Sequence, residues 1–282
     1  MTDIRRWLSL VRFSHTLFAL PFALAGLLAA SHGHPKWYDL VLVLCCMVTA
    51  RNAAMAFNRL IDAEHDAANP RTANRDIPAG RVAPRSALLF VIGNAVLFVV
   101  FSAVLNPLCL GLSPFALILI LGYSLAKRFT ALCHLWLGVA IGISPLAAGI
   151  AVTGRFLAVP ALLGAALWSW LTGFDIVYAT QDAAFDRGRG LHSIPALLGR
   201  DRSLLVAAGF HALTVGFLFL VGWSAHWGIP WHVVTVVCGA LLLWVHLMRK
   251  DDDLALQGGF FRANVFLSFA VLAGVAWEVW KR

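Results

Sequence analysis

Nine apolar runs, each long enough to cross a bilayer, take up most of the sequence. They lie near residues 13–31, 39–61, 85–105, 107–125, 131–152, 158–181, 203–223, 230–248 and 262–280. A hydrocarbon core about 30 Å thick requires about 20 apolar residues per helix, and lipid forces each backbone to satisfy its own hydrogen bonds. Only 13% of the residues are charged. We therefore predict an all-α, polytopic membrane protein with nine transmembrane helices, forming one integral-membrane domain over residues 1–282.

Basic residues are distributed unequally between the two sides of this predicted bundle. One side has only Lys36, Arg155, Lys281 and Arg282. The other side comprises the N-terminus and the loops after the second, fourth, sixth and eighth runs, and it holds Arg5, Arg6, Arg12, Arg71, Arg75, Arg81, Arg85, Lys127, Arg128, Arg187, Arg189, Arg200, Arg202, Arg249, Lys250 and Arg262. Positively charged loops stay in the cytoplasm. We expect a bacterial inner membrane protein with a cytoplasmic N-terminus.

The net charge of +8 mostly reflects this bias, and it favours an anionic lipid surface or substrate. No surface module of basic and aromatic residues points to nucleic acid, and no protein partner is indicated.

Half of the 14 acidic residues lie in two short windows at the expected cytoplasmic ends of helices. The first window follows the second run and the other ends the sixth; together they contain Asp62, Glu64, Asp66 and Asp76, then Asp175, Asp182 and Asp186. At about 100° per residue, Asn58, Asp62 and Asp66 lie one turn apart on one helix face. If the sixth helix continues, its three aspartates also share a face. Acids four residues apart repel one another, more so near hydrocarbon, so these two rows require a counter-charge.

A divalent metal is the simplest counter-charge for both rows. Hard oxygen ligands without a cluster of His or Cys indicate Mg²⁺, which usually takes one or two carboxylates and completes its shell with water and phosphate. Carboxylates beside basic loops therefore predict a diphosphate clamp. In the alternative interpretation the acids pair with loop arginines and cap helices. A divalent-cation transporter is a second class, but it would place its acids near the bilayer midplane.

The two windows also resemble each other. "DAANPRTANRDIPAG" from Asp66 and "DAAFDRGRGLHSIPAL" from Asp182 each run from an acid through Ala-Ala and a basic loop to Ile-Pro. This similarity suggests two related halves.

Several segments resemble the UbiA superfamily of intramembrane prenyltransferases. "NRLIDAEHD" from Asn58 resembles its NDxxDxxxD motif, and "YATQDAAFD" from Tyr178 resembles its second aspartate motif. "NPRTANRDIPAG", "YSLAKRFT" and "RFSHTLFALPFALAG" resemble two other cytoplasmic segments and the first helix. The resemblance runs from about Arg12 to Asn264 and is closest to the 4-hydroxybenzoate polyprenyltransferase branch. It departs at Arg59, where the family has an acid, and at His192, where many members have Lys.

The resemblance implies a UbiA-type bundle that transfers a polyprenyl group from its diphosphate to an aromatic acid. The active-site loops would be residues 62–84 and 182–202. The implied ligands of Mg²⁺ are Asn58, Asp62, Asp66, Asp182 and Asp186. The implied substrate-binding residues are Asn58, Arg51, Arg75, Lys127, Arg128 and Tyr178, and the implied catalytic residues are Asp175, Asp182 and Asp62.

Two charged residues lie deeper in the predicted helices: Asp175 is two turns from Asp182, and Arg51 is two turns from Asn58. Asp175 is expected to orient or deprotonate a phenol or to stabilise the allylic cation; the alternative is a buried acid bonded to Tyr123 or Tyr178. Arg51 is expected to face either Asp175 or the carboxylate of the acceptor.

The acceptor would be 4-hydroxybenzoate in quinone biosynthesis or a dihydroxynaphthoate in the futalosine route to menaquinone. Small residues from Leu137 to Gly149 permit either close helix packing or room for isoprene units.

Overall fold

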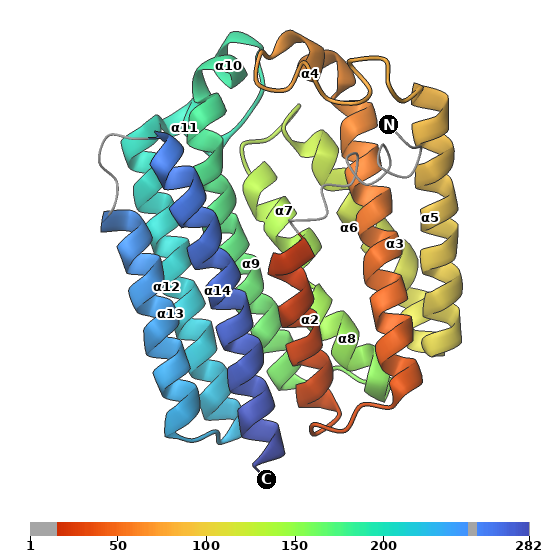
Figure 1. Cartoon of the computed structure of the whole chain (residues 1–282), viewed down its shortest axis with the longest axis vertical. Helices are drawn as coiled ribbons and strands as arrows, with labels where there is room; N and C mark the ends of the chain where they lie inside the picture. The colour runs from red at the N-terminus through yellow and green to blue at the C-terminus, as the bar shows by residue number, and fades with distance from the viewer. Residues whose placement is uncertain (1–15, 248–252, 282) are drawn as a thin grey trace.

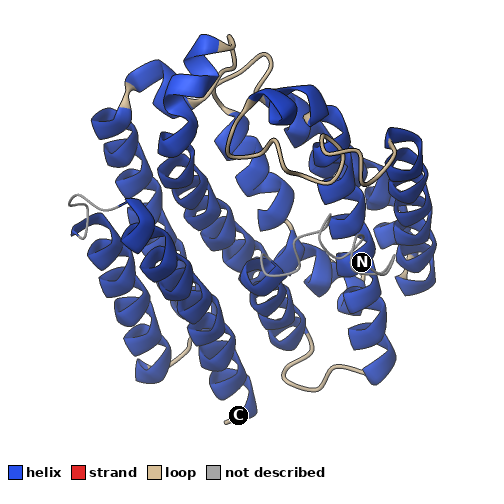
Figure 2. Ribbon diagram, turned by 45° about the horizontal axis from the view of Figure 1, so that its top comes forward, coloured by secondary structure: helices blue, strands red, loops and turns tan. Residues whose placement is uncertain are grey.

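The computed structural model describes residues 16–247 and 253–281, and over these residues it contains helices but no strands (Figures 1 and 2). The all-α prediction is confirmed. The elements are α2 (Thr16–Ala30), α3 (Trp37–Ile61), α4 (Ala63–Ala68), α5 (Pro84–Leu105), α6 (Pro107–Ala126), α7 (Cys133–Gly142), α8 (Ser144–Thr153), α9 (Ala158–Ala179), the 3₁₀ turn η2 (Thr180–Asp182), α10 (Ala183–Gly188), α11 (Ile194–Leu198), α12 (Arg200–Ala225), α13 (Ile229–Leu247) and α14 (Asp253–Trp280).

Eight helical stretches in the described residues are long and apolar enough to cross a membrane. They correspond to the second to ninth predicted runs. The first run appears as α2, whose described part is shorter, at 15 residues. The prediction of nine helices is therefore approximately confirmed. Several residues used to predict sidedness lie outside the described residues: Arg5, Arg6, Arg12, Arg249, Lys250 and Arg282.

The fifth predicted run spans the membrane as two helices rather than one. It separates at Ile143 into α7 and α8. The cause is Pro145, which lies in the first turn of α8 and has no N–H to donate to a carbonyl one turn back. The bonds on either side, from Ile143 to Val139 and from Ala147 to Ile143, are retained at 3.1 and 2.8 Å.

Both acidic windows interrupt their helices at an aspartate. Asp62 (φ −88°, ψ 4°) and Asp182 (φ −99°, ψ 2°) have the same backbone conformation, and each precedes a helix of six residues, α4 or α10. This equivalence supports the predicted similarity of the two windows. Such breaks are tolerated where the chain leaves the hydrocarbon, because water can then bond the backbone.

The two predicted rows of acidic residues differ in whether the helical hydrogen bonds continue across the break. In the first window the bonds from Asp62 to Asn58 and from Asp66 to Asp62 continue across the break, at 3.0 and 2.7 Å. In the second window a 3₁₀ turn, with three residues per turn, separates α9 from α10. One continuous helix from Asp175 to Asp186, the condition on which the second row depended, is therefore not observed.

Glycines bring α7 and α8 close to α9. A Cβ on Gly138 would lie 2.3 Å from the hydroxyl oxygen of Thr172, and one on Gly142 would lie 2.9 Å from the Cα of Trp168. Other residues of the same helices, including Leu137, Ala140 and Ser144, line a cavity instead. This segment therefore packs closely against α9 on one face and borders a cavity on another.

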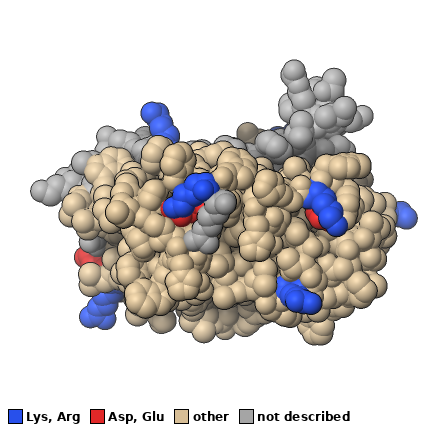
Figure 3. Space-filling view, turned by 90° about the horizontal axis from the view of Figure 1, so that it is seen from below, with Lys and Arg blue, Asp and Glu red and all other residues tan. Residues whose placement is uncertain are grey.

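The two ends of the bundle differ in the elements they carry. The end with α4 and α10, called the aspartate end below, contains both acidic windows (Figure 1). The opposite end shows scattered Lys, Arg, Asp and Glu among mostly uncharged residues (Figure 3). The candidate site is therefore built at one end of an apolar bundle.

Candidate active site

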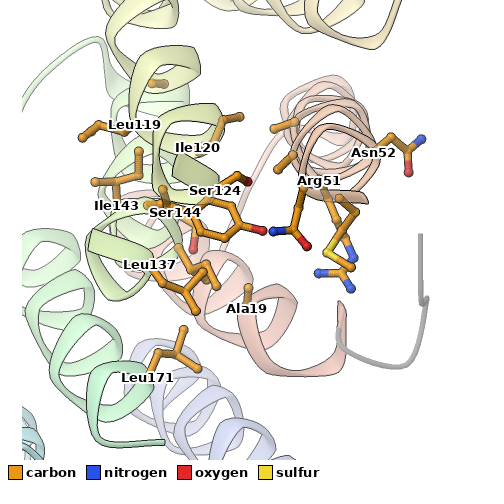
Figure 4. Close-up of a pocket in the computed structure, with 18 of the residues that line it drawn as sticks. Ala19, Arg51, Asn52, Leu119, Ile120, Ser124, Leu137, Ile143, Ser144 and Leu171 are labelled. Atoms are coloured by element: carbon orange, nitrogen blue, oxygen red, sulfur yellow. The ribbon is translucent and has the colours of Figure 1, made fainter. Parts of the chain in front are cut away.

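One cavity of about 1330 Å³ connects the two acidic windows with the interior of the bundle. Its lining includes Asp62 and Asp182 at the aspartate end and extends to Leu105 and Ile150, near the other ends of α5 and α8. Leu119 and Leu137 lie on one side of the part drawn in close-up, and Arg51 lies on the other (Figure 4). A charged mouth thus leads into a long, mainly apolar chamber.

Each candidate metal-binding aspartate has a basic partner from another segment. Asp66 and Asp186 are buried, whereas Asp62 and Asp182 are more accessible. The closest pairs are Arg128–Asp62 at 3.7 Å, Arg75–Asp66 at 2.6 Å, Arg71–Asp182 at 2.5 Å and Lys127–Asp186 at 2.9 Å. The alternative that the acids pair with loop basic residues is thus correct as a description of the contacts. It does not exclude a clamp, because all eight side chains line the same cavity.

Asn58 and Asp62 form the innermost part of the first window. The Asn58 amide donates to Oδ2 of Asp62 at 2.9 Å. Burial raises the pKa of the Asp62 carboxyl, the charge of Asp66 raises it further, and Arg128 and Lys127 act in the opposite direction. Buried Arg59, at the position where the sequence departs from the family motif, donates from Nη1 to the side-chain oxygen Oδ1 of Asn58 at 3.5 Å. A guanidinium thus occupies the place of an acid.

Lys127 and Asp186 provide the corresponding contact in the second window. Asp186 accepts from Lys127 at 3.0 Å and from the Ser193 hydroxyl at 2.9 Å. Burial lowers the pKa of the Lys127 ammonium, but the charge of Asp186 and its hydrogen bond outweigh this effect, and the pKa is raised overall. Lys127 is therefore a fixed positive charge at the mouth of the cavity.

Arg71 belongs to the site although the sequence prediction did not include it. Its Nε donates to Asp182 at 3.1 Å, and its guanidinium lies 5.9 Å from the centroid of the Tyr178 ring. Tyr178 in turn stacks on Phe174. The available signal was the spacing of Arg71 and Arg75, four residues apart in one loop.

The deeper aspartate pairs with a histidine that the sequence prediction missed. Oδ2 of Asp175 lies 2.6 Å from Nδ1 of His134, a partner that the sequence prediction did not name. Arg51 lines the same cavity. His134 is an ionisable side chain inside the apolar run 131–152. Such residues usually have a function, so the sequence did contain a signal for it.

The donor set of the mouth suits Mg²⁺ with a bound diphosphate. Within residues 16–247 and 253–281, no three His, Cys, Asp or Glu side chains are grouped closely enough to hold a metal ion. A cation here would need further oxygen ligands, which is how Mg²⁺ usually binds, through one or two carboxylates, water and substrate phosphate.

Comparisons with known proteins identify the family of the chain. The model of the UbiA prenyltransferase family matches residues 19–274. A 4-hydroxybenzoate octaprenyltransferase of Vibrio atlanticus is 30% identical over 94% of this chain and 93% of its own length. The enzyme of the same name from Thiobacillus denitrificans is 32% identical over 87% and 84%.

Solved structures show the same fold. A UbiA homolog from Aeropyrum pernix K1, in an apo structure, matches with a TM-score of 0.82 and 32% identity over 93% of this chain and 96% of its own. A UbiA homolog from Archaeoglobus fulgidus bound to GPP and Mg²⁺ matches with a TM-score of 0.72 and 21% identity over 95% and 99%. The chain therefore belongs to the UbiA prenyltransferase family and is an integral-membrane prenyltransferase similar to the 4-hydroxybenzoate octaprenyltransferases.

Proposed function

We propose that this protein transfers a polyprenyl group from a polyprenyl diphosphate to an aromatic acid, first of all 4-hydroxybenzoate, in a Mg²⁺-dependent reaction of quinone biosynthesis. The observation that carries the proposal is the single cavity, in which two acidic windows with basic partners form the mouth of an apolar chamber. The names of the relatives support the choice of acceptor.

The mouth of the cavity is the proposed diphosphate site. Asn58, Asp62 and Asp66 would hold one Mg²⁺, and Asp182 and Asp186 would hold another. When bound, Mg²⁺ neutralises the diphosphate and makes it a better leaving group. Arg71, Arg75, Lys127 and Arg128 now contact these carboxylates and can turn to phosphate oxygens, which arginine binds through its planar donor fork.

The chamber below the mouth is the proposed site of the prenyl tail. The whole cavity, mouth included, has a volume of about 1330 Å³, which exceeds the roughly 300–1,000 Å³ of ordinary small-molecule pockets. Side chains such as Leu119, Leu137 and Leu171 border it (Figure 4). A long apolar chain would gain by leaving water for such a surface.

The deeper charged residues are the proposed acceptor site. Asp175 would accept the phenol O–H, and Arg51 would bind the carboxylate. The allylic C–O bond breaks and its electron pair leaves with the diphosphate. The ring carbon beside the phenol then forms the new C–C bond, and that carbon releases its proton to restore aromaticity. The residues at the mouth stabilise the leaving group where its charge develops.

Loops 62–84 and 182–202 would face the cytoplasm of a bacterial inner membrane, because the loops on this side carry most of the Lys and Arg residues. The alternative acceptor is a dihydroxynaphthoate. In the transporter alternative, proteoliposomes would take up divalent metal without any prenyl diphosphate.

The deciding experiment incubates the purified protein with geranyl diphosphate, Mg²⁺ and a panel of aromatic acids, and identifies products by mass. We expect a prenylated 4-hydroxybenzoate that is absent when EDTA is added. If a dihydroxynaphthoate is prenylated and 4-hydroxybenzoate is not, the acceptor is the alternative one. If no acid is prenylated while the protein remains folded, the proposed function is incorrect.

A further inference from the structure

His134 binds one carboxylate oxygen of Asp175, and the Asp175 side chain remains accessible from the cavity. The His134 side chain is 1% exposed, whereas that of Asp175 is 28% exposed. The two residues come from facing helices, α7 and α9, and both border the cavity. Asp175 is therefore held from behind while part of its carboxylate faces a bound molecule.

The second ring nitrogen of His134 fixes the direction of this hydrogen bond. Nε2 of His134 accepts the backbone N–H of Ile194 at 3.3 Å. A backbone N–H can only donate, so Nε2 carries a lone pair and the ring proton is on Nδ1. His134 thus donates from Nδ1 to one oxygen of Asp175, and the other lone pairs of the carboxylate are available to accept a phenol O–H.

The group that anchors His134 belongs to the second acidic window. Ile194 begins α11, and the preceding Ser193 donates its hydroxyl to Asp186 at 2.9 Å and accepts the N–H of Ala196 at 3.2 Å. The adjacent His192 donates its N–H to the Lys127 carbonyl at 2.7 Å. A short bonded path therefore runs from Asp186 through Ser193 and Ile194 to His134 and Asp175.

We propose that His134 is a positioning residue, which orients the Asp175 carboxylate toward the phenol of the aromatic acceptor. This inference rests on the proposed function. His134 does not contact the acceptor itself; it acts through Asp175, in the way that residues behind an active-site group fix its orientation. Displacing a reacting group by about 1 Å can cost about 100-fold in rate, which sets the size of the effect that we expect.

Two substitutions separate hydrogen bonding from filling of space. His134→Leu replaces the imidazole with an apolar side chain of similar size, which loses the bonds to Asp175 and Ile194. His134→Gln keeps one donor and one acceptor. We expect kcat for 4-hydroxybenzoate to fall about 100-fold in His134→Leu. His134→Gln should recover most of this loss. The KM for the prenyl diphosphate should stay unchanged in both variants, because the mouth of the cavity is intact.

A double-mutant cycle with Asp175→Asn tests whether His134 acts through Asp175. If it does, His134→Leu combined with Asp175→Asn will be no slower than Asp175→Asn alone. His211→Leu is the matched control: His211 is also buried (3% exposed) and bonded to a side chain, His246, but it does not line the cavity. This control should retain the wild-type KM and kcat for both substrates.

The outcomes distinguish this inference from the proposed function. If the wild type prenylates no aromatic acid, the proposed function fails. If the wild type is active and His134→Leu matches it, or if the two losses multiply in the double variant, the positioning role is overturned. Should His134→Leu not fold in detergent, His134→Asn replaces it in the cycle, because the shorter amide cannot reach both Asp175 and Ile194.

Discussion

The guanidinium of Arg71 donates to both carboxylate oxygens of Asp182, which lies 111 residues further along the chain. This contact joins the loop after α4 to the 3₁₀ turn after α9 directly across the mouth of the cavity. Two helices that end in acids would otherwise repel each other at this point. The contact therefore explains how both windows can stay at one opening, and it identifies Arg71 as a group that a bound diphosphate would compete for.

Removing the carboxylate that begins either short helix should stop the release of diphosphate. We expect Asp62→Ala and Asp182→Ala each to abolish Mg²⁺-dependent diphosphate release, since each removes a proposed metal ligand that the protein cannot replace. The measurement is a diphosphate-release assay on purified protein, with folding followed by thermal unfolding in detergent. Glu64→Ala is the matched control, because Glu64 belongs to the first window but does not line the cavity. Full activity in both aspartate variants would refute the clamp.

Truncating Arg71 should weaken binding of the diphosphate substrate. Charged hydrogen bonds are worth about 1.5–3 kcal/mol, and partial exposure reduces this value. We therefore expect Arg71→Ala to raise the KM for geranyl diphosphate about tenfold, with a smaller rise in Arg71→Lys. Arg81→Ala serves as the control, because Arg81 pairs with Asp76 and does not line the cavity. An equal rise in KM for Arg71→Ala and Arg81→Ala would show a general loss of positive charge rather than a specific contact.

Arg51 should determine whether the acceptor needs a carboxylate. If its guanidinium binds the acid group, the wild type will prefer 4-hydroxybenzoate over 4-hydroxybenzamide. Arg51→Gln should reduce this preference about tenfold to hundredfold, the size of one charge-assisted hydrogen bond. The measurement is the ratio of kcat/KM for 4-hydroxybenzoate to kcat/KM for 4-hydroxybenzamide, in the wild type and in Arg51→Gln. An unchanged ratio would remove Arg51 from the acceptor site.

The sequence predicted the helices well and the contacts of the site only in part. The thickness of the bilayer sets the length of every apolar run that crosses it. The predicted runs around α3, α5 and α6 therefore match the helices of the structure closely. The break at Ile143 was indicated by Pro145 but not recognised. The breaks at Asp62 and Asp182 occur at the end of the hydrocarbon, where the pattern of apolar residues no longer constrains the backbone.

The sequence could place acids and bases at one end of the bundle but could not pair them. Arg71 and Asp182 are 111 residues apart, and His134 and Asp175 are 41 apart. Neither spacing follows a helical period, so each pair depends on which helices pack together. The pairing of Asp175 with His134 is a consequence of how α7 packs against α9.

Close contact between α7 and α9 should make Gly142 intolerant of a side chain. A Cβ there would lie 2.8 Å from the Cβ of Trp168 and 2.9 Å from its Cα, so the two helices would have to separate. Overpacking of this kind costs about 1–3 kcal/mol. We expect Gly142→Ala to lower the unfolding temperature in detergent and to reduce prenyl transfer, because moving α7 away from α9 also lengthens the bond between His134 and Asp175. Gly93→Ala is the control, since a Cβ there meets no atom within 4 Å, and its unfolding temperature should not fall. If Gly142→Ala is as stable and as active as Gly93→Ala, the packing of these helices does not hold the site together.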